Sequence, residues 1–330
     1  MRVLIVCSYR DFRPDGINQF IKEQVEAIVR LHKSPMNDER LTNERVEAEY
    51  YLVRGKGIAG YLKEIPKLRK AIREFQPDVI HAHYGLCGLL SSLATWRIPV
   101  VTTYHGSDIN HPKPRKFSKM AMRLSAWNIF VSQKTMDIVH GAERKNCSLI
   151  PCGVDLTDDQ LQTRAEARKA LGWKDNERKV LFAGMFEEVK GPELAFAAIN
   201  ELEKKGIKVD LIELRGYSRI EVNRLMCAVD CLLMASKTEG SPQVIKEALA
   251  CGCPIVSTDV GDVAERVMGV VGCYVIHSRD PKDMARAMEK AFAYDGKTEG
   301  REKVYADGLA NTLIADKIFT IYRTISKNKG

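Results

Sequence analysis

The chain has 330 residues, of which 45% are apolar and 28% are charged, the composition of an ordinary globular protein. No segment approaches the roughly 18 to 20 consecutive apolar residues that a transmembrane helix needs, and the length favours two domains. The formal net charge of +8 comes entirely from residues 1–157, which hold 24 Lys and Arg against 16 Asp and Glu. This asymmetry indicates that the N-terminal domain meets an anionic partner.

The first half of the chain alternates short apolar runs with amphipathic stretches. Strands are predicted at 2–7, 78–83, 99–105, 128–133 and 148–154, with a helix at 17–31. Residues 113–124 interleave basic with apolar side chains and predict a basic amphipathic helix. This helix faces either solvent or an anionic membrane, and the absence of any nucleic-acid-binding motif argues against a nucleic acid partner.

The alternation of apolar runs with amphipathic stretches begins again after residue 178. Strands are predicted at 179–185, 209–214, 231–236, 254–260 and 273–276, and helices near 191–205 and 306–326. Because the apolar runs are continuous rather than alternating, the strands should be covered on both faces, as in parallel sheets. The sequence therefore predicts two doubly wound, Rossmann-like α/β domains in tandem.

The cysteines and the first residues bear on the compartment and on metal binding. Nine cysteines, an odd number, include no C-x-x-C pair, so most should be reduced core thiols. Cys251 and Cys253 form a C-x-C with no second pair, and no D-x-D triplet occurs, so neither a metal nor a cofactor is predicted. The opening residues lack a signal-peptide pattern, and we expect a cytoplasmic protein.

The phosphate-binding element is predicted at a helix start in the second half. No G-x-G-x-x-G follows the first strand, and no G-x-x-x-x-G-K-[ST] occurs. Ser241 and Pro242 are typical of an N-cap and first helical residue, and this helix should end near Gly252. Its first N–H groups, those of Gln243, Val244 and Ile245, would point at a diphosphate beyond the preceding strand.

Two glutamates bracket this helix start. A carboxylate accepts two hydrogen bonds from a sugar diol, and such charge-assisted bonds are strong. Glu239 could therefore reach a hexose, and Glu247 a ribose. The alternative is that Glu239 only favours the helix dipole and Glu247 is solvated.

The surrounding sequence resembles a known family. TEGSPQVIKEALACGCPIVSTDVGD at 238–262 is similar to the donor-site signature of glycosyltransferase family 4, and LFAGMFEEVKGPELAFAAI at 181–199 to the segment that carries its phosphate-binding lysine, here Lys190. DGINQFIKEQVEAI at 15–28 resembles the family's first glycine loop and helix. DVIHAHYG and VTTYHGSD resemble its N-terminal crevice, and IPCGVD at 150–155 its entry to the second domain.

This resemblance implies a GT-B fold with two Rossmann-like domains facing a central cleft. Residues 1–157 would form the acceptor domain and 158–307 the donor domain, with a helix at 308–330 packing back on the first. The implied reaction transfers a hexose-type residue from a UDP- or GDP-sugar to a glycan or lipid-linked acceptor, with retention of configuration and without a metal. The setting would be cell-surface polysaccharide biosynthesis, with peripheral contact between 113–124 and the inner face of the cytoplasmic membrane.

The resemblance also implies site residues. The catalytic residues would be His105, Glu239 and Lys190. The donor-binding residues would be Gly16, Gly184, Lys190, Glu239, Gly240, Ser241, Gln243, Val244 and Glu247.

Two features keep alternatives open. His81 and His83 share one face of a strand, so a metal site with His105 and Asp108, as in amidohydrolase-like barrels, is conceivable. Met185 stands near the position where the family has an Arg, so Lys190, Arg215 or another Lys must supply that charge. The missing Arg makes a non-catalytic subunit of a polysaccharide assembly complex one rival function, and a nucleotide-sugar epimerase on the same fold is the other.

Overall fold

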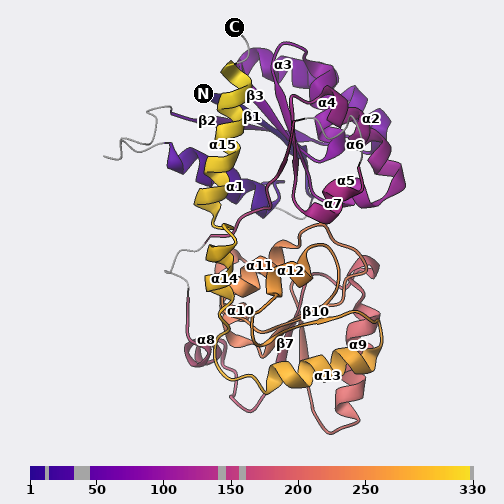
Figure 1. Ribbon diagram of the computed structural model, residues 1–330, viewed down its shortest axis with the longest axis vertical. Helices are drawn as coiled ribbons and strands as arrows, with labels where there is room; N and C mark the ends of the chain where they lie inside the picture. Colours follow the sequence, from indigo (N-terminus) through magenta and orange to yellow (C-terminus); the bar gives the residue numbers. More distant parts are fainter. Residues whose placement is uncertain (12–14, 33–44, 140–145, 156–160, 328–330) are drawn as a thin grey trace. The chain divides into compact units, whose positions relative to one another are not determined.

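The chain forms two compact units in the computed structural model, which describes residues 1–11, 15–32, 45–139, 146–155 and 161–327 (Figure 1). Unit 1 comprises Met1–Gly153 and Asn311–Gly330, and unit 2 comprises Val154–Ala310. The boundary expected between residues 157 and 158 lies among 156–160, outside the described residues, as do positions 328–330 of the expected C-terminal helix.

Unit 1 contains a six-stranded sheet in the order β2-β1-β3-β4-β5-β6, and every neighbouring pair is parallel. Its strands are β1 (Arg2–Ser8), β2 (Glu47–Val53), β3 (Val79–His83), β4 (Val100–Tyr104), β5 (Trp127–Phe130) and β6 (Cys147–Leu149). Its helices are α1 (Gln19–Leu31), α2 (Gly57–Lys63), α3 (Ile65–Phe75), α4 (Gly85–Ala94), α5 (Ser107–Asn110), α6 (Pro112–Leu124), α7 (Gln133–Asp137) and α15 (Asn311–Lys327).

Helices cover both faces of this sheet. Successive residues of a strand point to opposite faces, so each strand packs against helices on both sides. Val3 and Ile5 of β1 lie in one buried cluster with apolar residues of α1 and α15. Leu4 and Val6 lie in another with residues of α3 and α4. The continuous apolar run of β1 is therefore buried on both sides, as the sequence predicts for a parallel strand.

The last helix, α15, belongs to unit 1 although it follows unit 2 in the chain. It packs along α1, as Figure 1 shows for the yellow helix beside the indigo one. Its Tyr322 hydroxyl lies 2.5 Å from Nδ1 of the buried His81 in β3. The helix begins at Asn311 rather than at 308, because Gly308 has φ +66° and the chain there forms a bridge between Ala310 and Val154.

Unit 2 contains a five-stranded parallel sheet in the order β11-β10-β9-β7-β8. Its strands are β7 (Lys179–Phe182), β8 (Asp210–Glu213), β9 (Cys231–Met234), β10 (Ile255–Thr258) and β11 (Cys273–Ile276). Its helices are α8 (Arg164–Leu171), the 3-10 helix η3 (Glu188–Lys190), α9 (Pro192–Glu203), α10 (Arg219–Ala228), α11 (Gln243–Ala250), α12 (Val263–Val267), α13 (Pro281–Phe292) and α14 (Gly300–Ala306).

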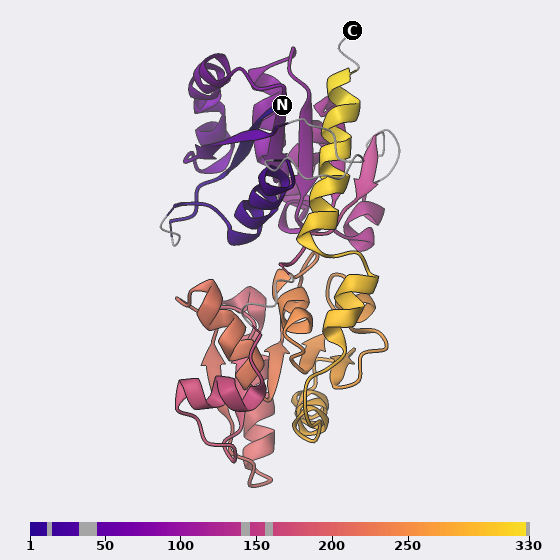
Figure 2. The ribbon, with the colours of Figure 1, turned by 90° about the vertical axis from the view of Figure 1, so that its left-hand side faces the viewer.

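The two faces of this sheet are also covered. Val180 and Phe182 of β7 are buried with α9 and α13, which pack against each other. Leu181 of the same strand is buried with residues of α10 and α11. Figure 2 shows this second unit, in rose to orange, from the side.

Each sheet has a switch point, where consecutive connections leave in opposite directions. In unit 1 it lies between β1 and β3, and in unit 2 between β7 and β9. Loops after the strands that flank such a point are the usual ligand-binding places in open α/β sheets. The predicted doubly wound parallel fold is confirmed for both units.

One strand is absent from the sequence analysis. β2 lies at the edge of its sheet and alternates exposed with partly buried residues, so it lacks the continuous apolar run that identified the other strands. No helix of the described part is both long enough and apolar enough to span a membrane.

Candidate functional site

The loops that follow β7 and β9 meet at the switch point of unit 2. Lys190 ends η3, and Glu239 lies in the loop after β9. Lys190 Nζ lies 2.7 Å from Glu239 Oε1, and Ser236 Oγ donates to the same carboxylate oxygen at 2.9 Å. Gly184 runs beside the lysine, since a Cβ on it would lie 3.4 Å from Lys190 Cε. Two residues that are 49 positions apart in the sequence thus form an ion pair at this edge.

Glycines allow the loops around this ion pair to approach closely. Gly191, directly after η3, has φ +66°, and a Cβ there would lie only 2.2 Å from the carbonyl oxygen of Ala235. Gly261 has φ +57°, and its Cβ would lie 2.4 Å from the carbonyl oxygen of Gly240. A side chain at either position would strain the backbone and push the loops apart.

The helix after Glu239 starts later than the sequence analysis expects. Pro242 is the N-cap of α11, Gln243 is its first residue, and no side chain caps it. The prediction that Ser241 caps the helix is wrong, because its hydroxyl donates to Asp262 Oδ2 at 2.7 Å. The backbone N–H of Ile245, which the sequence analysis assigned to the diphosphate, donates instead to the Pro242 carbonyl at 3.3 Å.

Glu247 lies in the second turn of α11, and its side chain is tilted back toward the first turn, formed by Gln243 and Val244. Arg219 Nη1 lies 2.9 Å from Glu247 Oε1. Arg219 is the first residue of α10, which follows β8 at the same sheet edge. The sequence analysis missed this cation, although the capping-box spacing that begins at Ser218 marks the start of its helix.

A buried charged cluster supports the loop before α11. Lys246 is fully buried, and its Nζ lies 3.1 Å from Ser241 Oγ. Asp262 accepts from Arg266 Nε at 3.0 Å, and Arg266 Nη1 lies 3.0 Å from Asp307 Oδ2. Charges are buried in proteins when they are paired, so this network anchors the loop rather than exposing charge to solvent. The sequence offers no signal for it, because only the fold brings these segments together.

In unit 1, His105 follows β4 at the corresponding sheet edge. Its Nε2 lies 3.0 Å from Nδ1 of His83, the last residue of β3, and its ring centroid lies 4.6 Å from that of Tyr84. Gly16 lies in the loop after β1 with φ +73°. Asn18 in the same loop donates to the Tyr84 hydroxyl at 3.1 Å. The loops after β1, β3 and β4 therefore converge near the switch point of unit 1.

The residues considered for a metal site have other partners. The described part of the chain contains no group of three or more His, Cys, Asp or Glu side chains arranged to hold a metal ion. Asp108 accepts hydrogen bonds at 2.9 to 3.0 Å from the backbone N–H groups of Gly85, His105 and Gly106. Burial raises the pKa of Asp108 to about 6, whereas these three donors favour its charged form. Its carboxylate thus fixes the turn after β4.

The basic stretch at 113–124 forms α6, which packs on α4. Arg115 does not contribute to its exposed basic surface, because its guanidinium donates to the carbonyls of Ile109 and Asn110 at 2.5 and 2.7 Å. Lys113 and Lys116 are exposed, as are the apolar Met120 and Leu124 at 47% and 53%.

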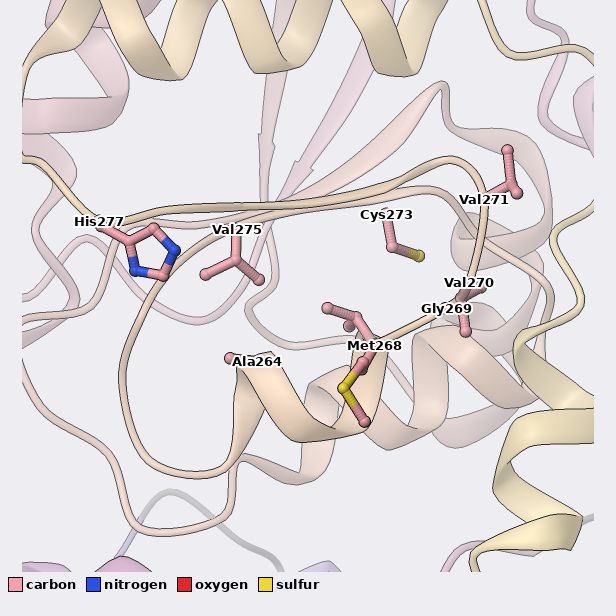
Figure 3. A pocket seen from close by; sticks show the side chains of 9 residues that line it. Ala264, Met268, Gly269, Val270, Val271, Cys273, Val275 and His277 are labelled. Atoms are coloured by element: carbon pink, nitrogen blue, oxygen red, sulfur yellow. The ribbon is translucent and has the colours of Figure 1, made fainter.

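A separate hollow of about 430 Å³ lies between α12 and β11 in unit 2 (Figure 3). It is lined by Ala264, Val267, Met268, Gly269, Val270, Val271, Cys273, Val275 and His277. None of these residues is among the predicted site residues, and its lining is mostly apolar, so it is unsuited to a diphosphate.

Two family models match the chain. The model of Glycosyltransferase Family 4 matches residues 17–158, and that of Glycosyl transferases group 1 matches residues 189–293. Among curated proteins, the D-inositol 3-phosphate glycosyltransferase of Mycolicibacterium gilvum is 27% identical over 270 residues, covering 69% of this chain and 61% of that protein. A Bacillus subtilis protein, TuaC, is 29% identical over 218 residues, covering 58% of this chain and 56% of its own length. The chain thus spans little more than half of these relatives.

Solved structures share the fold across almost the whole chain. Sucrose-phosphate synthase from Thermosynechococcus elongatus has a TM-score of 0.76 at 17% identity, with 98% of this chain and 99% of that chain covered. Anabaena HepE in complex with UDP has a TM-score of 0.69 at 16% identity, with 98% and 100% covered. At such identities the similarity establishes the GT-B fold alone. The Glycosyltransferase Family 4 model matches the first part of the chain and the Glycosyl transferases group 1 model the second, together about three quarters of the residues, so both parts of the chain are similar to glycosyltransferases.

Proposed function

We propose that this protein transfers a hexose-type residue from a UDP- or GDP-sugar to a hydroxyl of a glycan or lipid-linked acceptor. The observation that carries the proposal is the ion pair between Lys190 and Glu239 at the switch point of unit 2. A cation and a carboxylate held together at this place fit a ligand that has both phosphate oxygens and hydroxyl groups. HepE, which shares the fold, has been solved with UDP and with UDP-glucose.

Each partner of this ion pair has a role when the donor is bound. The diphosphate lies at the start of α11, where the first N–H groups and the helix dipole favour negative charge. Lys190 leaves the carboxylate for a phosphate oxygen, and Glu239 then accepts from hydroxyls of the sugar. Glu247 accepts from the ribose, and Arg219 beside it offers a cation in place of the Arg absent near Met185.

Catalysis then rests on stabilising the leaving diphosphate. Lys190 and the N–H groups of Gln243 and Val244 act where negative charge develops, which is the most effective place for fixed dipoles and cations. The transfer proceeds with retention, by departure of the diphosphate and attack of the acceptor on the same face, and the diphosphate takes the acceptor proton. No metal takes part. In unit 1, His105 donates a hydrogen bond to a substrate hydroxyl.

The acceptor is an intermediate in the biosynthesis of a cell-surface polysaccharide. The name of the relative TuaC refers to teichuronic acid biosynthesis, and the exposed lysines of α6 suit an anionic membrane surface. The enzyme would therefore work in the cytoplasm, against the inner face of the membrane.

A thermal-shift panel of UDP, GDP, ADP and their sugars tests the donor site first. A ligand at a hundred times its Kd stabilises the folded state by about 2.7 kcal/mol, which is readily seen as a rise in Tm. One base should give the shift, and Lys190→Ala should remove most of it. The selected sugar nucleotide is then incubated with candidate acceptors, and NMR reports the anomeric configuration of the product.

The outcomes discriminate among the functions. Conversion of the sugar nucleotide without an acceptor would establish the epimerase, and tight binding without any turnover the non-catalytic subunit. No shift with any nucleotide would refute the donor site at α11.

A further inference from the structure

His105 and His83 contact each other through one ring nitrogen each. Its Nε2 lies 3.0 Å from His83 Nδ1, and the two rings are nearly parallel, with centroids 5.3 Å apart. The other ring nitrogen of His105, Nδ1, lies 3.9 Å from the Cys152 thiol. One of the two nitrogens in the His83–His105 contact must donate and the other must accept.

The surroundings of His83 decide which nitrogen donates. His83 is fully buried, and the loss of solvation holds its pKa well below the usual range, so the ring is neutral. A neutral imidazole carries one N–H and one lone pair. Nε2 of His83 is buried and has no hydrogen-bond partner among the described residues.

A proton on Nε2 would leave a buried N–H without an acceptor, which is the costlier arrangement. The proton of His83 therefore belongs on Nδ1, from which it donates to His105.

The neighbouring His81 cannot change this arrangement. Its ring stacks on that of His83 with centroids 4.4 Å apart, but both of its nitrogens have other partners. Nδ1 lies 2.5 Å from the Tyr322 hydroxyl, and Nε2 lies 2.8 Å from the Thr103 hydroxyl. Burial lowers the pKa of His81 to about 3, so no positive charge lies on this side of His83 at neutral pH.

We propose that His83 is a positioning residue that fixes neutral His105 in the Nδ1–H tautomer. Nε2 of His105 is then occupied as an acceptor, so His105 serves as a hydrogen-bond donor from Nδ1 and not as a base. The Cys152 thiol is a weak acceptor that a substrate hydroxyl oxygen readily replaces. This role for a substrate hydroxyl rests on the proposed transferase function, whereas the tautomer does not.

The other groups around His105 are compatible with a neutral ring. Tyr84 packs against it with its centroid 4.6 Å away, and the carboxylate of Asp108 accepts from its backbone N–H at 3.0 Å. The Arg10 guanidinium lies over the ring of Tyr84, 5.6 Å from its centroid. Protonating His105 at Nε2 would require the hydrogen bond from His83 to break, so this bond favours the neutral ring.

The test combines NMR of 15N-labelled histidines with two substitutions of His83. His83→Asn places an amide N–H near the original Nδ1 and should keep the Nδ1–H tautomer of His105. His83→Leu removes the donor, so His105 should shift to the Nε2–H form. Loss of one such hydrogen bond corresponds to about a two- to tenfold fall in kcat for the Leu variant, with rescue by Asn. Thermal unfolding checks that both variants are folded.

The NMR result stands apart from any activity. An Nε2–H tautomer of His105 in the unaltered protein would overturn the proposal, and so would an unchanged tautomer in a folded His83→Leu variant. Failure of every sugar nucleotide to react would count against the proposed transferase while leaving the tautomer result intact.

Discussion

Replacing Glu239 and Glu247 separately with Gln should change nucleotide affinity in opposite directions. Glu239 Oε1 lies 2.7 Å from Lys190 Nζ, and both side chains are partly exposed, 17% for Glu239 and 29% for Lys190. Glu239→Gln removes this competitor for the lysine. Because Gln keeps the size of Glu, packing should change little.

The two magnitudes follow from the kind of interaction lost. A partly exposed ion pair contributes up to about 1 kcal/mol, so freeing Lys190 should tighten binding of the free nucleoside diphosphate by up to roughly fivefold. Glu247→Gln removes a charge-assisted bond to the ribose. Such a bond contributes about 1.5 to 3 kcal/mol, which weakens the same ligand roughly ten- to a hundredfold.

Calorimetry with the diphosphate and steady-state kinetics with the sugar nucleotide measure both effects. Glu239→Gln should bind the diphosphate at least as well as the unaltered protein yet lose transfer, because its proposed hydroxyl partners are on the transferred sugar. Glu188→Gln is the matched control, since it removes the same charge two residues before Lys190 at a side chain that is 93% exposed. Its diphosphate affinity should stay within about twofold.

The reasoning would be refuted if both substitutions weakened the diphosphate equally, because the two carboxylates would then share one role. If neither altered binding or transfer, the start of α11 would not be the donor site.

Three further results are expected. Burial lowers the pKa of His81 to about 3, so the unfolded chain binds a proton on this residue before the folded protein does, and the free energy of unfolding falls as the pH drops below 6.5. At pH 4.5 this residue should lower the free energy of unfolding by about 3 kcal/mol. Urea unfolding should show a smaller decrease between neutral pH and pH 4.5 for His81→Gln. An equal loss in the variant would exclude His81 as the cause. Changing Lys113, Lys116 and Lys119 to Glu should abolish binding to anionic liposomes and spare nucleotide affinity, whereas reversing the lysines of 204–208 should not; salt-insensitive binding would contradict a membrane role. Excess EDTA should leave transfer intact, and rescue by Mg²⁺ or Mn²⁺ would contradict the proposed site.

Local sequence predicted most of the fold because parallel strands that are buried on both faces consist of continuous apolar runs. β1, β3 and β4 were found this way, and so was α15 from its apolar face. β2 was not, since an edge strand with one open face lacks that signal. The segment around Glu239 and Glu247 could also be identified from local sequence, because the start of the helix and the two carboxylates lie within a few residues of one another.

Tertiary structure decided which of these residues meet. The ion pair of Lys190 with Glu239 depends on β7 and β9 being neighbours, and the contact of Arg219 with Glu247 depends on α10 and α11 starting at the same sheet edge. Ser241 fits a helix cap by local propensity, yet its hydroxyl turns to Asp262, 21 positions away. Likewise, the tautomer that we propose for His105 depends on the burial of His83 on another strand. Sequence alone specified most of the elements and the chemistry expected of their residues, whereas partners distant in the chain are chosen by strand order and burial, which no local pattern contains.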